Sequence, residues 1–230
     1  MADIKKSETC VLIPAYNEER NIARVAGRVR DLGFHVVIVD DGSSDRTVDN
    51  AKKLQGVDVL TSSVNQGKGA VLRRGFQWFL STKYSALVMM DADGQHDPEE
   101  LDLFITALNA GRMDFVVGNR MSQPTGMPLV RRVTNRFLSW IISSVAGQKI
   151  PDSQCGYRAL KRAVLEKISL KTTRFEIESE MLLEAARKGF VIGWVPIRSV
   201  YEGEKSQINP VRDTLRFFSF LFKYLIKRGS

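Results

Sequence analysis

The chain lacks several features that define common protein classes. It has two cysteines, Cys10 and Cys155, among 230 residues. Two cysteines form no disulfide framework, and we expect both to be reduced thiols in a cytosolic protein. No run of about 20 apolar residues occurs, which argues against a transmembrane helix. The start, 1–6, is polar and precedes a strand-like segment, so we expect no secretory signal.

Motifs of several other nucleotide-binding and catalytic classes are also missing. No Gly-x-Gly-x-x-Gly follows the first strand-like segment, which argues against a dinucleotide fold. The run Gly67 to Gly69 is not a Walker loop, because the four-residue spacing and the Ser or Thr are absent. The two histidines, His35 and His96, form no metal pair, and no Ser-His-Asp or Cys-His order is evident.

Charge is distributed unevenly along the chain. Residues 1–119 carry a net charge of −3 and residues 120–230 carry +11, which gives +8 overall. An acidic first half suits a metal ion, and a basic second half suits phosphates or an anionic membrane. The alternative is that the basic residues only solvate helices.

Strand-like and helix-like segments alternate in the first half. Apolar runs predict strands at 9–14, 36–40, 57–60, 86–90 and 115–118, and the segments between them predict helices at 18–31, 45–54, 68–80 and 98–110. The second half predicts helices at 131–146, 175–188 and 210–227, a polar turn at 152–158 and a strand at 191–196. This alternation predicts a parallel sheet covered on both faces, with ligands outside the carboxyl ends of its strands.

Two aspartates, Asp91 and Asp93, follow the fourth predicted strand. Carboxylates at positions i and i+2 of a turn can bind one hard divalent cation, and Gln95 can add a neutral oxygen. A cation there would neutralise the diphosphate of a nucleotide donor as it leaves. The alternative is a turn in which the aspartates only cap backbone amides.

Polar residues also follow the first two predicted strands. A carboxylate at a strand end, such as Asp40, can accept hydrogen bonds from a base N–H or a ribose hydroxyl. The functional interpretation gives Tyr16 to base stacking and Glu18 to the ribose. The alternative is that both segments are helix-entry loops, with Glu18 favoured by the helix dipole.

The C-terminal segment, 210–227, has the pattern of an interfacial helix. Its basic stripe consists of Arg212, Arg216, Ser219, Lys223 and Lys227. The other positions form a wide apolar face that is rich in phenylalanine, and the segment at 131–141 repeats this pattern. We expect these helices to dock on a membrane. The alternative is that they pack on the domain or on a partner subunit.

Four motifs resemble a known family. They are Val11 to Glu18, Val39 to Asp45, Asn65 to Gly69 and Met90 to Pro98. Together they are similar to family-2 glycosyltransferases with the GT-A fold, in particular to the dolichyl-phosphate mannose synthase-like and undecaprenyl-phosphate sugar transferases. The resemblance implies a Rossmann-like α/β three-layer fold with a mostly parallel sheet. It implies a catalytic domain at 1–209, with a nucleotide-sugar half at 1–120 and an acceptor half at 121–209, and an amphipathic helix at 210–230.

The resemblance also implies roles for individual residues. The nucleotide sugar would be held by Pro14, Ala15, Tyr16, Glu18, Ile38, Asp40, Asp41, Lys68, Ala92, Arg120 and Lys205. The metal, Mg²⁺ or Mn²⁺, would be held by Asp91, Asp93 and Gln95. The catalytic set would be Asp91, Asp93, Arg120 and Asp152. The acceptor would be framed by Arg131, Arg132, Tyr157 and Arg158.

The implied function is inverting transfer of one hexose from a donor of the GDP-mannose or UDP-glucose type to dolichyl or undecaprenyl phosphate. The acceptor phosphate is already an anion, so no strong general base is needed. The expected partners are the donor, the acceptor, a membrane surface and a membrane-anchoring subunit, with no nucleic acid. The expected location is peripheral, on the cytoplasmic face of a membrane.

Three other functions stay open from the sequence alone. A glycosyltransferase with a hydroxyl acceptor on a sugar, protein or small molecule needs a base, which would be Asp152, Glu176, Glu178 or Glu180. A nucleotidyltransferase would need a Gly-rich, Arg-containing loop after the first strand, and that loop is absent. A non-catalytic membrane scaffold would have no use for the intact aspartates at 91 and 93.

Overall fold

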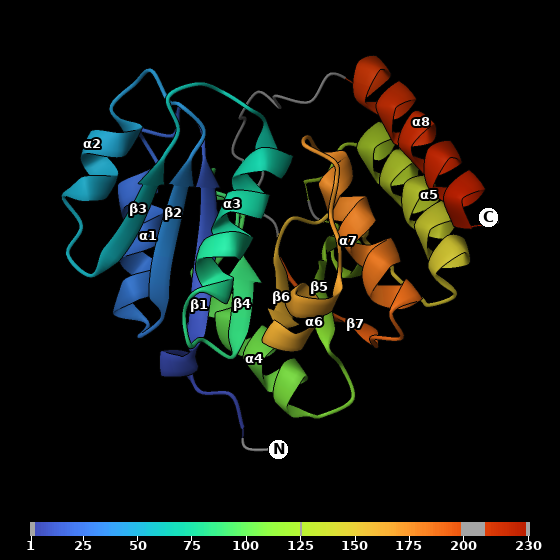
Figure 1. Ribbon diagram of the computed structural model, residues 1–230, viewed down its shortest axis with the longest axis horizontal. Coiled ribbons are helices and arrows are strands. Elements are labelled where there is room, and N and C mark those ends of the chain that lie inside the picture. Colours follow the sequence, from blue (N-terminus) through green and yellow to red (C-terminus); the bar gives the residue numbers. More distant parts are fainter. Residues whose placement is uncertain (1–2, 125, 199–209, 229–230) are drawn as a thin grey trace.

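The computed structural model describes residues 3–124, 126–198 and 210–228, and within the last range it describes the side chains of 216–226 (Figure 1). The first half contains β1 (Thr9–Ala15), α1 (Ile22–Asp31), β2 (His35–Asp40), α2 (Thr47–Lys52), β3 (Val57–Thr61), α3 (Lys68–Leu80), β4 (Ala86–Met89), α4 (Leu101–Asn109) and β5 (Phe115–Asn119). The second half contains α5 (Leu129–Ala146), β6 (Arg158–Lys161), α6 (Arg162–Lys167), α7 (Glu176–Arg187), β7 (Ile192–Pro196) and α8 (Pro210–Arg228). Short 3₁₀ turns are η1 (Lys6–Glu8), η2 (Pro98–Glu100) and η3 (Arg120–Ser122).

One seven-stranded sheet of order β3-β2-β1-β4-β6-β5-β7 draws strands from both halves of the chain. In the parallel pairs around β1, Leu12 lies beside Val37 of β2 and Met89 of β4. Strand β6 runs antiparallel to β4 and β5, whereas β7 is parallel to β5. The expected mostly parallel α/β fold is confirmed.

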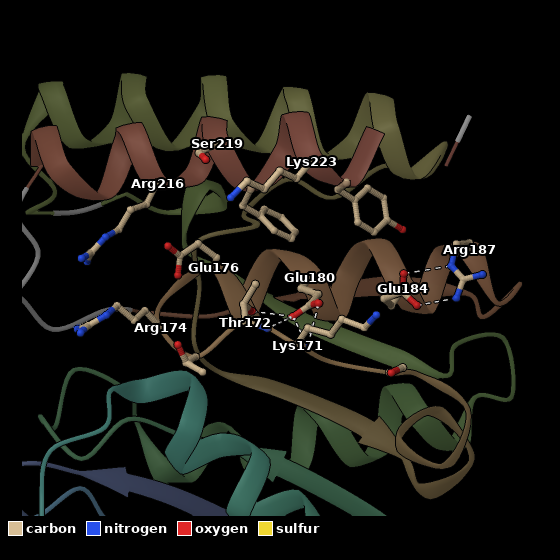
Figure 2. A pocket seen from close by; sticks show the side chains of 14 residues that line it. Lys171, Thr172, Arg174, Glu176, Glu180, Glu184, Arg187, Arg216, Ser219 and Lys223 are labelled. Atoms are coloured by element: carbon tan, nitrogen blue, oxygen red, sulfur yellow. Dashed lines mark hydrogen bonds and ion pairs between the residues drawn. The ribbon is translucent and has the colours of Figure 1, made fainter. Parts of the chain in front are cut away.

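Helices cover both faces of the sheet, which explains its continuous apolar strands. Helix α3 contacts β1, β2, α6 and α7 on one face, and α1 contacts α2, β2 and the turn η2 on the other. Because each central strand is covered twice, side chains of both pleat orientations are buried, as in Val36 to Val39 of β2. Beyond the sheet, α5 and α8 lie side by side next to α7 (Figures 1 and 2).

Two local expectations were wrong. Helix α1 begins at Ile22 rather than at Glu18, because Asn17 is left-handed (φ 56°) and the Glu18 backbone N–H donates to Thr47 Oγ1 at 2.7 Å. The polar segment after Asp152 leads into β6, a four-residue strand that was not predicted. The strand begins at Arg158 and ends at Lys161, so the sequence shows no apolar run that predicts it. It forms because β4 and β5 pair with it on either side. Among the described residues, none of the helices combines the length and apolar character needed to cross a membrane.

Candidate functional site

The loops after β1 and β2 hold each other in place. The backbone N–H of Asn17 donates to Ser43 Oγ at 2.9 Å, and the backbone N–H of Ser44 donates to Asn17 Oδ1 at 2.9 Å. The backbone N–H of Asp41 also donates to the carbonyl of Ala15 at 2.9 Å. These hydrogen bonds join the two loops into one surface. Tyr16 is partly exposed on that surface.

The two aspartates at the end of β2, Asp40 and Asp41, are buried and build turns. The Asp40 carboxylate accepts the backbone N–H groups of Gly42 and Ser43, each at 3.0 Å, and the Ser43 hydroxyl. The Asp41 carboxylate accepts the backbone N–H groups of Gln66 and Gly67, each at 2.8 Å, and so ties the third loop to the second. Both carboxylates therefore shape the surface that a nucleoside would meet.

Glycine at position 42 is required by the approach of that third loop. Its φ is 74°, and a Cβ built there would lie 2.7 Å from the carbonyl carbon of Val64. Two residues before the end of β2, Ile38 is fully buried, so its side chain is not available to a nucleoside.

Lys68 bridges two carboxylates at the centre of the site. Its Nζ donates to Asp91 Oδ1 at 2.7 Å and lies 2.7 Å from Glu178 Oε1, an ion pair between α3 and α7. The three side chains are 18%, 28% and 11% exposed, respectively. Burial lowers the pKa of Lys68, but the charges of Asp91 and Glu178 outweigh it and raise the pKa well above its ordinary value. Lys68 is therefore a permanent cation beside the predicted metal site.

The start of α3 has its own structural requirement. A Cβ on Gly69 would clash with the carbonyl carbon of Thr173. The glycine lets the segment before α7 pack directly on the first turn of α3, which brings Lys68 and Glu178 together. The sequence marks Glu178 only as an alternative base, because nothing local indicates its ion pair with Lys68, a residue distant in the chain.

Asp91 is held from several sides. Burial raises its pKa, but the charges of Lys68, His96 and Arg120 outweigh burial and lower the pKa to about 2. The backbone N–H of Asp91 donates to Nδ1 of His96 at 3.3 Å. Burial lowers the pKa of His96 and so favours the neutral ring, in which Nδ1 can accept this N–H. A Cβ on Gly156 would clash with Asp91 Oδ2, which explains a glycine at that turn.

The predicted metal ligands fit a cation that is shared with a substrate. Asp93 is partly exposed and accepts the backbone N–H of Gln95 at 2.9 Å through Oδ1, whereas Oδ1 of Asp91 is bound by Lys68. No group of three or more His, Cys, Asp or Glu side chains within the described ranges could hold a metal ion. Mg²⁺ commonly takes one or two carboxylates and completes its shell with water and substrate phosphates. Asp91, Asp93 and Gln95 suit that mode of binding.

Arg120 and Asp152 bind each other inside the protein. Nε and an Nη of Arg120 donate to the two carboxylate oxygens at 2.8 and 3.0 Å, and the Arg120 backbone N–H adds a bond of 3.2 Å. The Asp152 side chain is 0% exposed. Arg120 and Asp152, which the resemblance both assigns to catalysis, thus form one buried unit at the end of β5.

The predicted acceptor residues divide into two groups. Tyr157 and Arg158 are fully buried, and the Arg158 guanidinium donates to the carbonyls of Ser153 at 2.8 Å, Cys155 at 2.7 Å and Glu178 at 2.5 Å. They shape the turn from inside, and in this structure neither faces solvent. Arg131 and Arg132 lie in the first turn of α5 and are partly exposed.

The remaining predicted residues also differ in placement. Ala15 and Ala92 are buried, whereas Pro14 in β1, Glu18 in the loop after β1 and Gln95 in the loop after β4 are partly exposed. Lys205 lies outside the described residues.

A groove of about 950 Å³ runs between α7 and α8 (Figure 2). Glu180 lies on its wall, and its carboxylate accepts the backbone N–H groups of Lys171 at 3.0 Å and Thr172 at 2.9 Å, with the Thr172 hydroxyl at 2.6 Å. Glu184 pairs with Arg187 at 2.7 Å. The lining includes neither Asp91, Asp93 nor Arg120, so the groove is separate from the predicted metal site.

Known proteins are similar to this chain in sequence and in fold. Residues 10–169 match the model of glycosyl transferase family 2. The chain is 37% identical to polyprenol monophosphomannose synthase from Mycolicibacterium smegmatis, over 82% of this chain and 76% of the relative. It is 31% identical to UDP-N-acetylglucosamine–dolichyl-phosphate N-acetylglucosaminyltransferase from Methanococcus voltae, over 96% of each chain.

A solved structure agrees at the level of the fold. Glucosyl-3-phosphoglycerate synthase from Mycobacterium tuberculosis, crystallised with Mn²⁺ and UDP-glucose, has a TM-score of 0.71 at 18% identity, covering 96% of this chain and 78% of that one. The family match spans β1 to β6 and contains the loops that carry Asp40, Lys68, Asp91 and Asp152. The resemblance found in the motifs is confirmed, and the chain belongs to glycosyl transferase family 2.

Proposed function

We propose that this enzyme transfers one hexose from a nucleotide-diphosphate sugar to a polyprenyl phosphate, with inversion at the anomeric carbon. An oxygen of the acceptor phosphate forms the new bond to that carbon, and the bond from the carbon to the donor diphosphate breaks. Relatives named for polyprenol and dolichyl-phosphate acceptors support this acceptor class. Donors of the GDP-mannose and UDP-glucose types both remain within the proposal.

The observation that carries the proposal is that three of the four candidate bases are already engaged, and the fourth, Glu176, lines the separate groove between α7 and α8. Asp152 is fully buried with both oxygens bound to Arg120, and Glu180 accepts bonds from Lys171 and Thr172. Glu178 forms an ion pair with Lys68. A hydroxyl acceptor needs a base that can take its proton, whereas a phosphate monoester is already an anion at neutral pH. The site therefore suits an acceptor that brings its own negative charge.

The proposed donor site lies at the ends of β1, β2 and β4. The nucleoside meets the joined loops that carry Tyr16 and Glu18. Bound Mg²⁺ or Mn²⁺, held by Asp91, Asp93 and Gln95, would supply positive charge to the leaving diphosphate. Lys68 adds a fixed cation at the same place, and the pair formed by Arg120 and Asp152 supports the rim on which the acceptor phosphate binds.

In this proposal, successive segments of the chain have different roles. Residues 1–120 form the nucleotide-sugar half, 121–209 the acceptor half, and 210–230 an interfacial helix. The enzyme would work as a peripheral protein on the cytoplasmic face of a membrane, with or without an anchoring subunit. The basic character of residues 120–230, net +11, supports this placement beside lipid phosphates.

Two linked measurements test the proposal. Calorimetry with Mn²⁺ against a panel of GDP- and UDP-sugars identifies the donor, and transfer is then assayed with polyprenyl phosphate, with polyprenol as the matched hydroxyl acceptor. We expect metal-dependent transfer to the phosphate and none to the alcohol. Efficient transfer to the alcohol or to a soluble sugar, with none to the phosphate, would overturn the acceptor assignment.

A further inference from the structure

The ammonium group of Lys68 lies between carboxylates from two different parts of the chain. Its Nζ is 2.7 Å from Asp91 Oδ1, in the loop after β4, and 2.7 Å from Glu178 Oε1, in the first turn of α7. The other carboxylate oxygen of Glu178 is 4.0 Å from a guanidinium nitrogen of the buried Arg158. The four charges therefore alternate in sign from Asp91 to Arg158, and Glu178 has a cation on each side.

Contacts of the backbone fix the place of Glu178. A guanidinium nitrogen of Arg158 donates to the backbone carbonyl of Glu178 at 2.5 Å. The backbone N–H of Ala70, in the first turn of α3, donates to the carbonyl of Thr173 at 3.1 Å, just before α7. Glu178 is the third residue of α7, where the helix dipole favours a carboxylate. The meeting of Lys68 with Glu178 is thus set by two helix starts that are bonded to their surroundings.

Lys68 binds an oxygen that the predicted metal site also needs. Its Nζ donates to Asp91 Oδ1, and a Cβ on Gly156 would clash with Oδ2 of the same carboxylate, so the turn crowds that second oxygen. An ammonium group on Asp91 opposes a second cation there, because like charges at close range repel each other. Glu178 offers Lys68 another carboxylate at the same distance, so the lysine can remain paired when Asp91 binds a metal ion.

We propose that Glu178 is a positioning residue of the transfer reaction, which holds the ammonium group of Lys68 beside the metal site and leaves Asp91 for the metal. The inference rests on the proposed function and assigns Glu178 no contact with donor or acceptor. An ammonium group has three N–H bonds. Lys68 can therefore keep one on Glu178 and direct another to an oxygen of the leaving diphosphate, where a fixed cation stabilises the developing charge.

Manganese binding without donor or acceptor tests this role apart from activity. Glu178→Gln keeps the size of the side chain but removes its charge, so Lys68 is left with Asp91 as its carboxylate partner. We expect Mn²⁺ affinity, measured by electron paramagnetic resonance, to fall about tenfold. Lys68→Met removes the competing cation and should raise Mn²⁺ affinity about tenfold. An affinity that Glu178→Gln leaves unchanged overturns the proposal.

Glu184 provides a matched control on the same helix. Its side chain is 11% exposed, as that of Glu178 is, and it forms an ion pair of the same length, 2.7 Å, with Arg187. Mn²⁺ affinity should therefore stay as in the parent in Glu184→Gln. Urea unfolding of both variants separates a loss of stability from a loss of Mn²⁺ affinity. If Glu178→Gln does not fold, Glu178→Asp, which keeps the charge on a shorter side chain, should show a smaller loss of Mn²⁺ affinity.

Steady-state kinetics at saturating Mn²⁺ shows whether Glu178 acts through Lys68. With polyprenyl phosphate as acceptor, Glu178→Gln should lower kcat about tenfold and leave the acceptor KM within about twofold. In the Lys68→Met enzyme the same change should not lower kcat further, because no ammonium group remains to be held. A further loss of kcat in that background would make Glu178 itself a base or a substrate ligand and would overturn the proposal.

Failure of the proposed function gives a different result. If the parent enzyme transfers nothing to polyprenyl phosphate, the proposed acceptor fails. The comparison of Mn²⁺ affinities uses neither substrate and still decides the role of Glu178.

Discussion

Arg120 and Asp152 are joined by two side-chain hydrogen bonds, of 2.8 and 3.0 Å, and the Asp152 side chain has no solvent exposure. Burying such a pair costs hydration free energy for both charged groups. Their mutual attraction offsets this cost only while both partners are present. The pair links the end of β5 to the turn before β6, and so makes the geometry of the predicted acceptor rim depend on a buried charge.

Asp152→Asn should destabilise the protein by about 3–5 kcal/mol, because it removes the buried carboxylate to which the guanidinium and the backbone N–H of Arg120 donate. Urea unfolding followed by circular dichroism measures this. The matched control is Asp102→Asn, which breaks an ion pair with Lys6 whose side chains are 59% and 41% exposed. That exposed pair should contribute less than about 1 kcal/mol. Equal effects of the two substitutions would contradict the importance of the buried pair.

Arg120→Lys keeps the positive charge but loses the planar fork that binds two carboxylate oxygens at once. We expect kcat/KM for transfer to fall at least tenfold, while Arg112→Lys, an exposed change on another loop, leaves it unaltered. Steady-state kinetics with donor and acceptor varied in turn would detect this. An Arg120→Lys enzyme with both KM values and kcat unchanged would remove Arg120 from the site.

Asp93→Asn should abolish metal-dependent transfer and weaken Mn²⁺ binding, measured by electron paramagnetic resonance, without unfolding the protein. The side chain lies in a turn, and its hydrogen bond is to the nearby backbone N–H of Gln95. Asp97→Asn is the control in the same loop, because Asp97 caps η2 through the backbone N–H of Glu99. It should cost about 1 kcal/mol of stability and leave Mn²⁺ affinity intact. Normal turnover by Asp93→Asn in EDTA would disprove the assignment.

Lys68→Met should destabilise the protein over a defined pH window. The depressed pKa of Asp91, about 2 in the folded protein, contributes stability above its unfolded value near 4 and loses it as pH falls towards 2. The raised pKa of Lys68 contributes stability below its unfolded value near 10 and loses it as pH rises further. The stability gap between parent and variant should therefore be widest from about pH 4 to pH 10 and narrow on either side. A pH series of urea denaturation tests this, with the exposed Lys53→Met expected to show no such window.

The two thiols should be inert in the folded enzyme. Burial raises the pKa of Cys155 to about 12 and that of Cys10 well above its ordinary range, so little thiolate forms at pH 8. We expect no reaction with a disulfide reagent such as dithionitrobenzoate in buffer, and reaction of both thiols in urea. Rapid modification of either cysteine in native protein would show that its pocket opens.

The sequence by itself determined the elements whose signal is local. The apolar runs of β1, β2, β4 and β5 predict strands, and the pattern at Lys68–Leu80 predicts a helix with the bounds that α3 has. Because strands of a parallel sheet end at one edge, the polar residues that follow them have to meet there. For that reason the positions of Asp40 and Asp91 along the chain are enough to place them near one another.

Only the tertiary structure decided what depends on contacts between distant segments. Strand β6 has four residues and exists through its two neighbours, and its antiparallel direction leaves no trace in local periodicity. The sequence shows that Arg158 is charged but not whether it is exposed to solvent, and the resemblance assigns it to the acceptor. In the structure its buried guanidinium donates hydrogen bonds to three backbone carbonyls. The pairing of Lys68 with Glu178, and of Arg120 with Asp152, arises because the packed chain brings opposite charges together out of water, where neither can remain alone.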